Sequence, residues 1–194
     1  MALSNGAAEF LVLSVKPKFA EAIVDGRKTI EIRRQKPNVK PGTLGFVYSS
    51  SPTQAVVGSF RVDRVFSTTP EELWVEAEAH AEISKRDFDD YFAGVGIGHG
   101  IIVSCGKRFQ KPIKLSQLRL VWPGWKPPRS FGYLVATDAY SLRLMSAFRH
   151  RMINDGQQTG MSIDVRDESD SLRDQRGAFH LKSHELKALI SLLS

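Results

Sequence analysis

Cysteine is scarce in this sequence, and a long apolar run is missing from its first part. The one cysteine, Cys105, excludes an internal disulfide and a cysteine-rich zinc site, and it fits a reducing compartment. The longest apolar run near the start, residues 10–15, is too short for a membrane span or for the hydrophobic core of a signal peptide. These scarcities predict an intracellular protein with no membrane partner, located in the cytoplasm, or in the nucleus if its source is eukaryotic.

The rest of the composition is that of an ordinary globular protein. The chain has 194 residues, of which 42% are hydrophobic and 25% are charged. This length corresponds to about one domain, and the hydrophobic share is sufficient to build a packed core. Disorder throughout the chain is therefore not expected.

Acidic residues are missing from one stretch of the chain, which makes the net charge of +6 informative. Residues 107–129 contain seven Lys or Arg and no Asp or Glu, while residues 14–64 contain ten against four. Between these two basic segments, residues 71–90 contain eight acidic and two basic side chains. If the fold brings the basic segments together, they form a positive face for phosphate groups. Scattered, solvated lysines are the alternative explanation of the same charge.

The hydrophobic pattern predicts a small sheet with helices inserted between its strands. Strands are expected over residues 10–15, 29–33, 43–48, 55–66, 101–104 and 131–135. Helices are expected over residues 17–25, 70–79, 84–92, 138–153 and 183–193, with a short helical turn ending near residue 119. Gly26, Thr69 and Ser84 are the expected helix caps, and residues 153–160 read as a flexible linker. Such an arrangement predicts an α+β fold with a partly closed β-barrel.

The densest group of charged residues surrounds the predicted strand at residues 29–33. In the string GRKTIEIRRQKP, Lys28, Glu31, Arg33 and Arg34 follow one another closely, and strand alternation places Glu31 and Arg33 on one face. A carboxylate beside cations can accept a hydrogen bond from a nucleobase while the cations hold phosphate. A set of ion pairs on an exposed strand is the competing interpretation.

The same region resembles the beginning of an ASCH domain, a family related to PUA domains. The string LSVKPKFAEAIVDGRKTIEIRR contains a G-x-K-x-x-E-x-R element, and the later strings ISKRDFDDYFAG, GHGIIV, KPIKLSQLR and PPRSFGYL are also similar to members of the family. The resemblance implies a PUA-like β-barrel over residues 10–135, preceded by a flexible lead over 1–9 and followed by a C-terminal helical extension over 136–194.

The resemblance also implies a cleft for RNA or a nucleotide-like ligand beside the first helix. We expect RNA before DNA, with a base held over Glu31. The residues expected to bind nucleic acid are Lys16, Lys28, Glu31, Arg33, Arg34, Arg129 and Ser130. No cofactor and no metal are expected, and the extension is a candidate surface for a protein partner or for self-association.

A hydrolase acting on a modified nucleoside or on RNA is the alternative function, so enzymatic activity is left open. Some relatives are amidohydrolases that use a lysine and a threonine three residues further along, but Glu31 occupies that second position here. Lys28 and Glu31 are then the catalytic candidates. For RNA cleavage, Lys28 could act with Tyr48, Ser130 or His99.

Trp122 and Trp125 lie among cations in the string WPGWKPPRSF, so their rings are candidates for stacking on bases. The alternative is that both tryptophans pack under the barrel rim. His180 and His184 are spaced for one helical face, but no third metal ligand is near them in the sequence. A metal site is therefore not predicted there.

Overall fold

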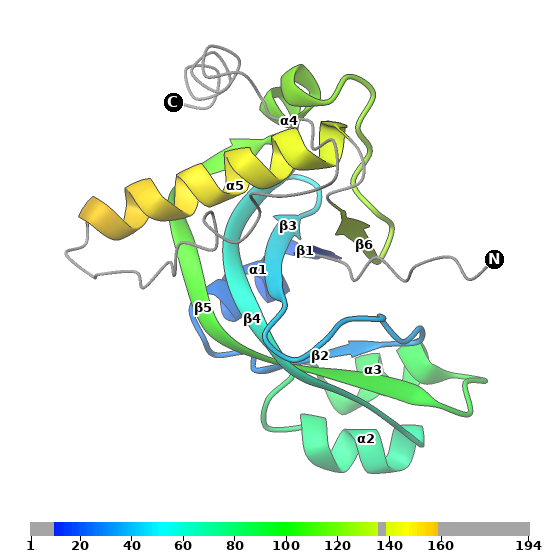
Figure 1. Ribbon diagram of the computed structural model, residues 1–194. Coiled ribbons are helices and arrows are strands. Elements are labelled where there is room, and N and C mark those ends of the chain that lie inside the picture. Colours follow the sequence, from blue (N-terminus) through cyan, green and yellow to red (C-terminus); the bar gives the residue numbers. More distant parts are fainter. Residues whose placement is uncertain (1–9, 136–138, 159–194) are drawn as a thin grey trace, which may run out of the picture.

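The computed structural model describes residues 10–135 and 139–158 as a mixed sheet curled into a half-barrel, with helices at its two ends and behind it (Figure 1). The strands are β1 Phe10–Val15, β2 Ile30–Arg33, β3 Leu44–Ser49, β4 Ala55–Thr68, β5 Gly98–Lys114 and β6 Phe131–Leu134. The helices are α1 Pro17–Val24, α2 Pro70–Ala77, α3 Lys85–Phe92, α4 Leu115–Val121 and α5 Ala139–Gln158. The predicted α+β class is confirmed, and the predicted, partly closed barrel is a half-barrel.

The strand order is β2-β5-β4-β3-β1-β6, and β1 and β3 are parallel neighbours. The outermost strands β2 and β6 nevertheless approach each other across the curled sheet. The Asn38 N–H, just after β2, donates to the Tyr133 hydroxyl of β6 at 2.8 Å. This contact partly closes the barrel, as the short strands and inserted helices led us to expect.

The helices cover different parts of the sheet. Figure 1 shows α4 and α5 at one end of the long strands β4 and β5, and α2 and α3 at the other. Helix α1 packs closely on the middle of the sheet because two strand positions are glycines: a Cβ at Gly106 would lie 2.2 Å from the Ile23 carbonyl oxygen. A Cβ at Gly58 would lie 2.6 Å from a Val24 methyl carbon. A larger residue at Gly106 would push the helix away, and one at Gly58 would also meet the Lys107 carbonyl oxygen of β5, at 2.2 Å.

Three apolar cores result from this arrangement. One core joins α4 and α5 to one face of β1 and β3, and a second lies between α1 and the other face of these strands. A third joins α2 and α3 to Ile30 and Ile32 of β2. The two isoleucines therefore face one way and leave Glu31 and Arg33 on the opposite face, as their alternation predicted.

The sequence predicted most of these elements and missed the extent of two of them. Strand β5 is much longer than the predicted 101–104, because glycines and exposed polar residues hid its alternation. The predicted linker at 153–160 is wrong for residues 153–158, which belong to α5. Buried Asp155 explains the error, since its carboxylate accepts the Gln110 backbone N–H at 3.3 Å and anchors this turn to β5. The predicted helix at 183–193 and the histidines at 180 and 184 lie outside the described residues.

Helix α5 packs against the barrel through a continuous apolar side. The Phe148 and Phe46 ring centroids are 4.5 Å apart, and Leu144 and Met145 are buried beside them. The first part of the predicted extension is thus joined to the barrel core, while the division of the chain at residue 135 stays a prediction. Within the part of the chain that the structure describes, no helix has the length and apolarity needed to cross a membrane.

Candidate functional site

A buried group of three charged side chains joins β2 to the end of α1. The Glu31 carboxylate lies 2.9 Å from an Arg33 guanidinium nitrogen and 3.3 Å from the Lys28 ammonium nitrogen. All three side chains are less than a tenth exposed. A carboxylate between two cations balances charge that burial would otherwise make costly.

Lys28 is turned toward the protein. Its ammonium group donates to the Ala81 carbonyl oxygen and lies 5.0 Å from the centre of the Phe19 ring, and the residue is 2% exposed. Burial lowers the pKa of Lys28, while the charge and hydrogen bond of Glu31 act to raise it. These contacts make Lys28 a component of the barrel wall.

Arg33 connects β2 to the opposite edge of the sheet. Its guanidinium donates to the Ser130 hydroxyl oxygen and to the Ser14 carbonyl oxygen, both at 3.1 Å. The Ser130 carbonyl oxygen in turn accepts the Ser14 N–H at 2.9 Å. The three residues therefore meet at the carboxyl end of β1, although they come from parts of the chain far apart in sequence.

Tyr48 also lies at the carboxyl end of its strand. The parallel strands β1 and β3 end side by side, and Ser14 pairs with Tyr48. Phe10, Val12 and Tyr48 pack into one core, so strand alternation directs Ser14 to the same side of the sheet. The Tyr48 ring is buried against Trp125, with ring centroids 5.8 Å apart. We refer to Ser14, Arg33, Tyr48 and Ser130 as the carboxyl-edge cluster.

Burial raises the pKa of Tyr48, and the positive charge of Arg119 acts to lower it. Because the net shift is upward, the phenol stays protonated at neutral pH and can donate a hydrogen bond or a proton. Arg119 is held nearby by its own bond, in which its Nε donates to the Trp125 carbonyl oxygen at 3.3 Å.

The cluster also holds polar groups whose bonding capacity is not used. Ser14 Oγ and Arg33 Nε are buried with no hydrogen-bond partner among the described residues. Ser130 accepts a bond from Arg33, which leaves its own O–H free to donate. Hydroxyl donors beside a fixed guanidinium are suited to an oxyanion such as a phosphate.

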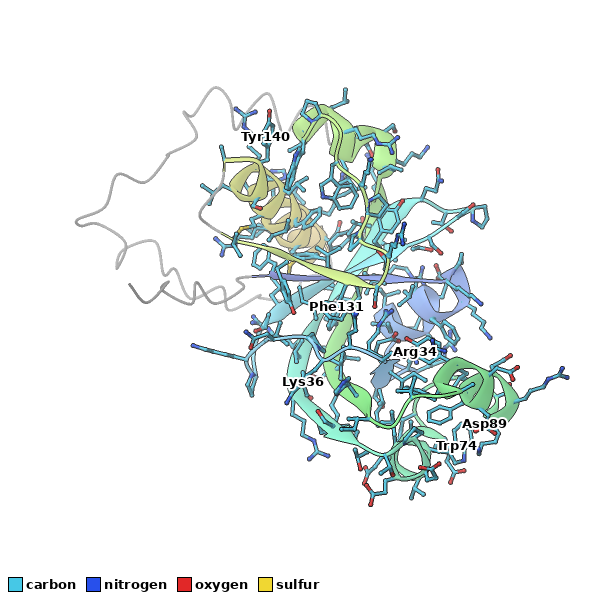
Figure 2. All side chains as sticks on the ribbon, turned by 90° about the vertical axis from the view of Figure 1, so that its right-hand side faces the viewer. Arg34, Lys36, Trp74, Asp89, Phe131 and Tyr140 are labelled. Carbon is cyan, nitrogen blue, oxygen red and sulfur yellow. The ribbon has the colours of Figure 1, made fainter. Side chains whose placement is uncertain are left out.

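The other predicted site residues lie at different distances from this cluster. Lys16 and Arg129 are both exposed. Lys16 directly follows β1 and Arg129 directly precedes Ser130, so the charges of both residues border the cluster. Arg34 is held elsewhere, next to α3 (Figure 2). Its Nε donates to the Tyr91 carbonyl oxygen of that helix, and its guanidinium lies 4.8 Å from the centre of the Tyr91 ring. His99 pairs with Ser67, with 2.9 Å between Nδ1 and Oγ. Burial, with a smaller contribution from the charge of Lys36, lowers the pKa of His99.

Two residues of this region were missed by the sequence prediction, Ser14 and Arg119. The alternation of β1 could have placed Ser14 on the side of Phe10 and Val12, but nothing local indicates that Arg33 reaches its carbonyl. Arg119 lies in the predicted second basic segment, but its position beside Tyr48 depends on the docking of α4. In the described ranges, no three His, Cys, Asp or Glu side chains lie close enough together to hold a metal ion.

Comparison with known proteins finds similarity to ASCH domains. A family model described as the ASCH domain matches residues 13–102. An ASCH domain-containing ribonuclease from Zymomonas mobilis is 29% identical over 131 residues, which are 68% of this chain and 88% of that protein. A large ribosomal subunit protein from Ureaplasma parvum is 26% identical over 126 residues, but these are only 39% of its length.

Crystal structures of the Zymomonas mobilis ASCH protein are also similar. One is 25% identical with a TM-score of 0.65, and the match covers 75% of this chain and 94% of that one. A tyrosine-to-phenylalanine variant of that protein is 26% identical with a TM-score of 0.65, covering 71% and 96%. A serine-to-alanine variant is 25% identical with a TM-score of 0.66, covering 72% and 96%.

Proposed function

Because this chain contains an ASCH domain on a PUA-like half-barrel, we propose that it binds single-stranded RNA at the carboxyl edge of β1 and β3 and cleaves the RNA backbone. The observation that carries the proposal is the carboxyl-edge cluster, which combines a protonated phenol, hydroxyl groups and a fixed guanidinium at one edge. The similarity to a ribonuclease supports RNA as the substrate. Tyr48 and Ser130 are the residues of the cluster to test, because their hydroxyl groups are its proton donors.

The proposed reaction uses the 2′-hydroxyl of the RNA itself. Its oxygen attacks the neighbouring phosphorus, and its proton passes to water. As the new oxygen–phosphorus bond forms, the bond from phosphorus to the 5′-oxygen of the next nucleotide breaks, and that oxygen takes the phenol proton of Tyr48. A proton from water restores the phenol. The products are a 2′,3′-cyclic phosphate and a 5′-hydroxyl end.

The charged residues have two roles in this proposal. Exposed Lys16 and Arg129 attract the backbone, and the Ser130 hydroxyl donates to a phosphate oxygen. Arg33 orients Ser130 and supplies positive charge beside the phosphate, which makes it a positioning residue. Lys28 and Glu31 support Arg33 from inside the barrel.

The alternative of a hydrolase acting on a modified nucleoside has less support. It needs Lys28 to reach a substrate, yet this residue is 2% exposed and its ammonium group donates to the Ala81 carbonyl oxygen. Tyr48 is buried to a similar extent, at 3% exposed, so burial alone does not separate the two functions. What weakens the alternative is Glu31, which occupies the position of the threonine of the amidohydrolase relatives.

The test is single-turnover cleavage of an end-labelled RNA oligonucleotide by the full chain. We expect the wild-type protein to produce a 2′,3′-cyclic phosphate end and to leave a DNA oligonucleotide of the same sequence uncut. Tyr48→Phe should slow cleavage about 100-fold or more by removing the acid, and Ser130→Ala should slow it by a similar factor by removing a donor to the phosphate. Binding of RNA by both variants should change by less than about threefold, since most affinity comes from phosphate–cation contacts.

Tyr91→Phe is the matched control, because this tyrosine lies on α3 and its ring contacts do not depend on the hydroxyl. It should cleave at the wild-type rate. Binding without cleavage by the wild-type protein would leave a binding module and reject the catalytic proposal. Equal cleavage of DNA would reject attack by the 2′-hydroxyl.

A further inference from the structure

A basic hollow lies beside the carboxyl-edge cluster, between the β3–β4 connection and the start of α4. It measures about 260 Å³ and is lined by Thr53, Gln54, Lys114, Ser116 and Arg119 among others. It contains two cations and no carboxylate, and its hydroxyl and amide groups can hydrogen-bond to an anion. Its volume is below the roughly 300 Å³ at which pockets begin to hold a whole ligand, so it suits one chemical group of a larger molecule.

Backbone hydrogen bonds fix the wall of the hollow to the end of β1 and to the start of α4. The Ser50 N–H donates to the carbonyl oxygen of Val15 at the end of β1, at 2.9 Å, and the Leu115 N–H donates to the Gln54 carbonyl oxygen at 2.8 Å. The connection between β3 and β4 is therefore fixed to both β1 and α4. Arg119 lines the hollow and also acts electrostatically on Tyr48.

Another hollow, at the acidic end of the sheet, is unsuited to the same ligand. It measures about 470 Å³, lies between α2 and α3, and is lined by the carboxylates of Glu71 and Asp89. These charges repel phosphate, whereas Lys114 and Arg119 attract it.

We propose that the basic hollow binds a second RNA phosphate, at a position that flanks the cleaved one. This inference rests on the proposed function and extends it by a second phosphate subsite. Ser130 precedes β6 and Tyr48 lies on β3, with β1 between them, so an RNA chain that crosses from Ser130 to Tyr48 passes over two strand spacings, or roughly 10 Å. The hollow lies beyond Tyr48, where β4 begins and β5 ends. Such a path is perpendicular to the strands, and it places the Tyr48 phenol between the two phosphates.

The experiment combines protein variants with RNA in which one phosphate is neutral. A set of short RNAs carries a methylphosphonate at one flanking position at a time, and binding of each is measured with the full chain. For the wild-type protein, one flanking position should lower affinity about tenfold when neutralised, the factor expected for losing a charge-assisted hydrogen bond. In Arg119→Gln and Lys114→Gln, affinity for unmodified RNA should fall by a similar factor, and neutralising that position should have no further effect.

Controls separate a local effect from loss of fold or of net charge. Arg86→Gln removes one exposed positive charge from α3, far from the hollow, and should keep the wild-type sensitivity to the methylphosphonate. Arg119→Lys keeps the charge and should recover part of the affinity. Unfolding transitions of all variants should match that of the wild type.

The outcomes distinguish the subsite from the function on which it rests. If RNA is bound and cleaved but Arg119→Gln and Lys114→Gln remain as sensitive to every methylphosphonate as the wild type, the second phosphate does not occupy the hollow and the proposed function stands. If the wild-type protein neither binds nor cleaves RNA, both proposals are rejected.

Discussion

At the residue scale, the sequence predicted the position of Glu31 correctly, but the structure gives its carboxylate a different role from the predicted one. Its place between Lys28 and Arg33 on one strand face followed from the sequence. The sequence offered these groups as ligands for a base and phosphates, whereas the structure surrounds the carboxylate with two protein cations and leaves little of it exposed. Burial depends on how β2 curls toward β6, and no local pattern encodes that contact.

Glu31→Gln should destabilise the protein more than Lys28→Met does. Loss of the carboxylate leaves two buried cations without a counter-charge, which costs about 3 kcal/mol or more, while Lys28→Met leaves Glu31 paired with Arg33 and should cost less than half as much. Urea unfolding of both variants measures the two free energies. Equal losses would contradict the view that Glu31 balances both cations at once.

At the element scale, local signals predicted where helices begin better than where strands and helices end. Thr69 and Ser84 each accept a backbone N–H at the start of α2 and α3, as their positions in the sequence indicated. The end of α5 was misjudged because Gly156 and its polar neighbours resemble a linker. Contact of Asp155 with β5 outweighs this weak local preference, which is why tertiary structure was needed to find it.

The packing of α5 predicts that this helix stabilises the whole barrel. Phe148→Ala should lower the free energy of unfolding by about 3–5 kcal/mol, because the Phe148 ring is fully buried against Phe46. Ile153→Ala is the control on the same helix, and since Ile153 is 39% exposed its loss should stay below about 1 kcal/mol. Both values come from denaturant unfolding followed by circular dichroism. An unchanged stability of Phe148→Ala would mean that α5 is not part of the cooperative unit.

At the scale of the whole molecule, the alternation of charge along the sequence becomes a separation in space. The acidic segment forms α2 and α3 at one end of the sheet, and the second basic segment includes α4 at the other (Figure 1). Not every basic residue is available for a ligand, since Arg108 pairs with Glu21 and with Asp25 on or beside α1. The sequence thus predicted the sign of each region, and the fold decides which cations remain exposed.

This separation predicts that the acidic end influences how fast RNA arrives but not how it is cleaved. Glu76→Lys combined with Glu78→Lys changes two exposed side chains at the far end of the sheet. The association rate constant for RNA should rise about threefold or more at low salt, because long-range repulsion is removed. At 1 M salt the screening length falls to about 3 Å, so the rate should return to the wild-type value.

Stopped-flow association and single-turnover cleavage give the two readouts. A change in the cleavage rate of bound RNA would contradict the assignment of cleavage to the carboxyl-edge cluster alone, and a rate difference that persists at 1 M salt would show direct contact with α2.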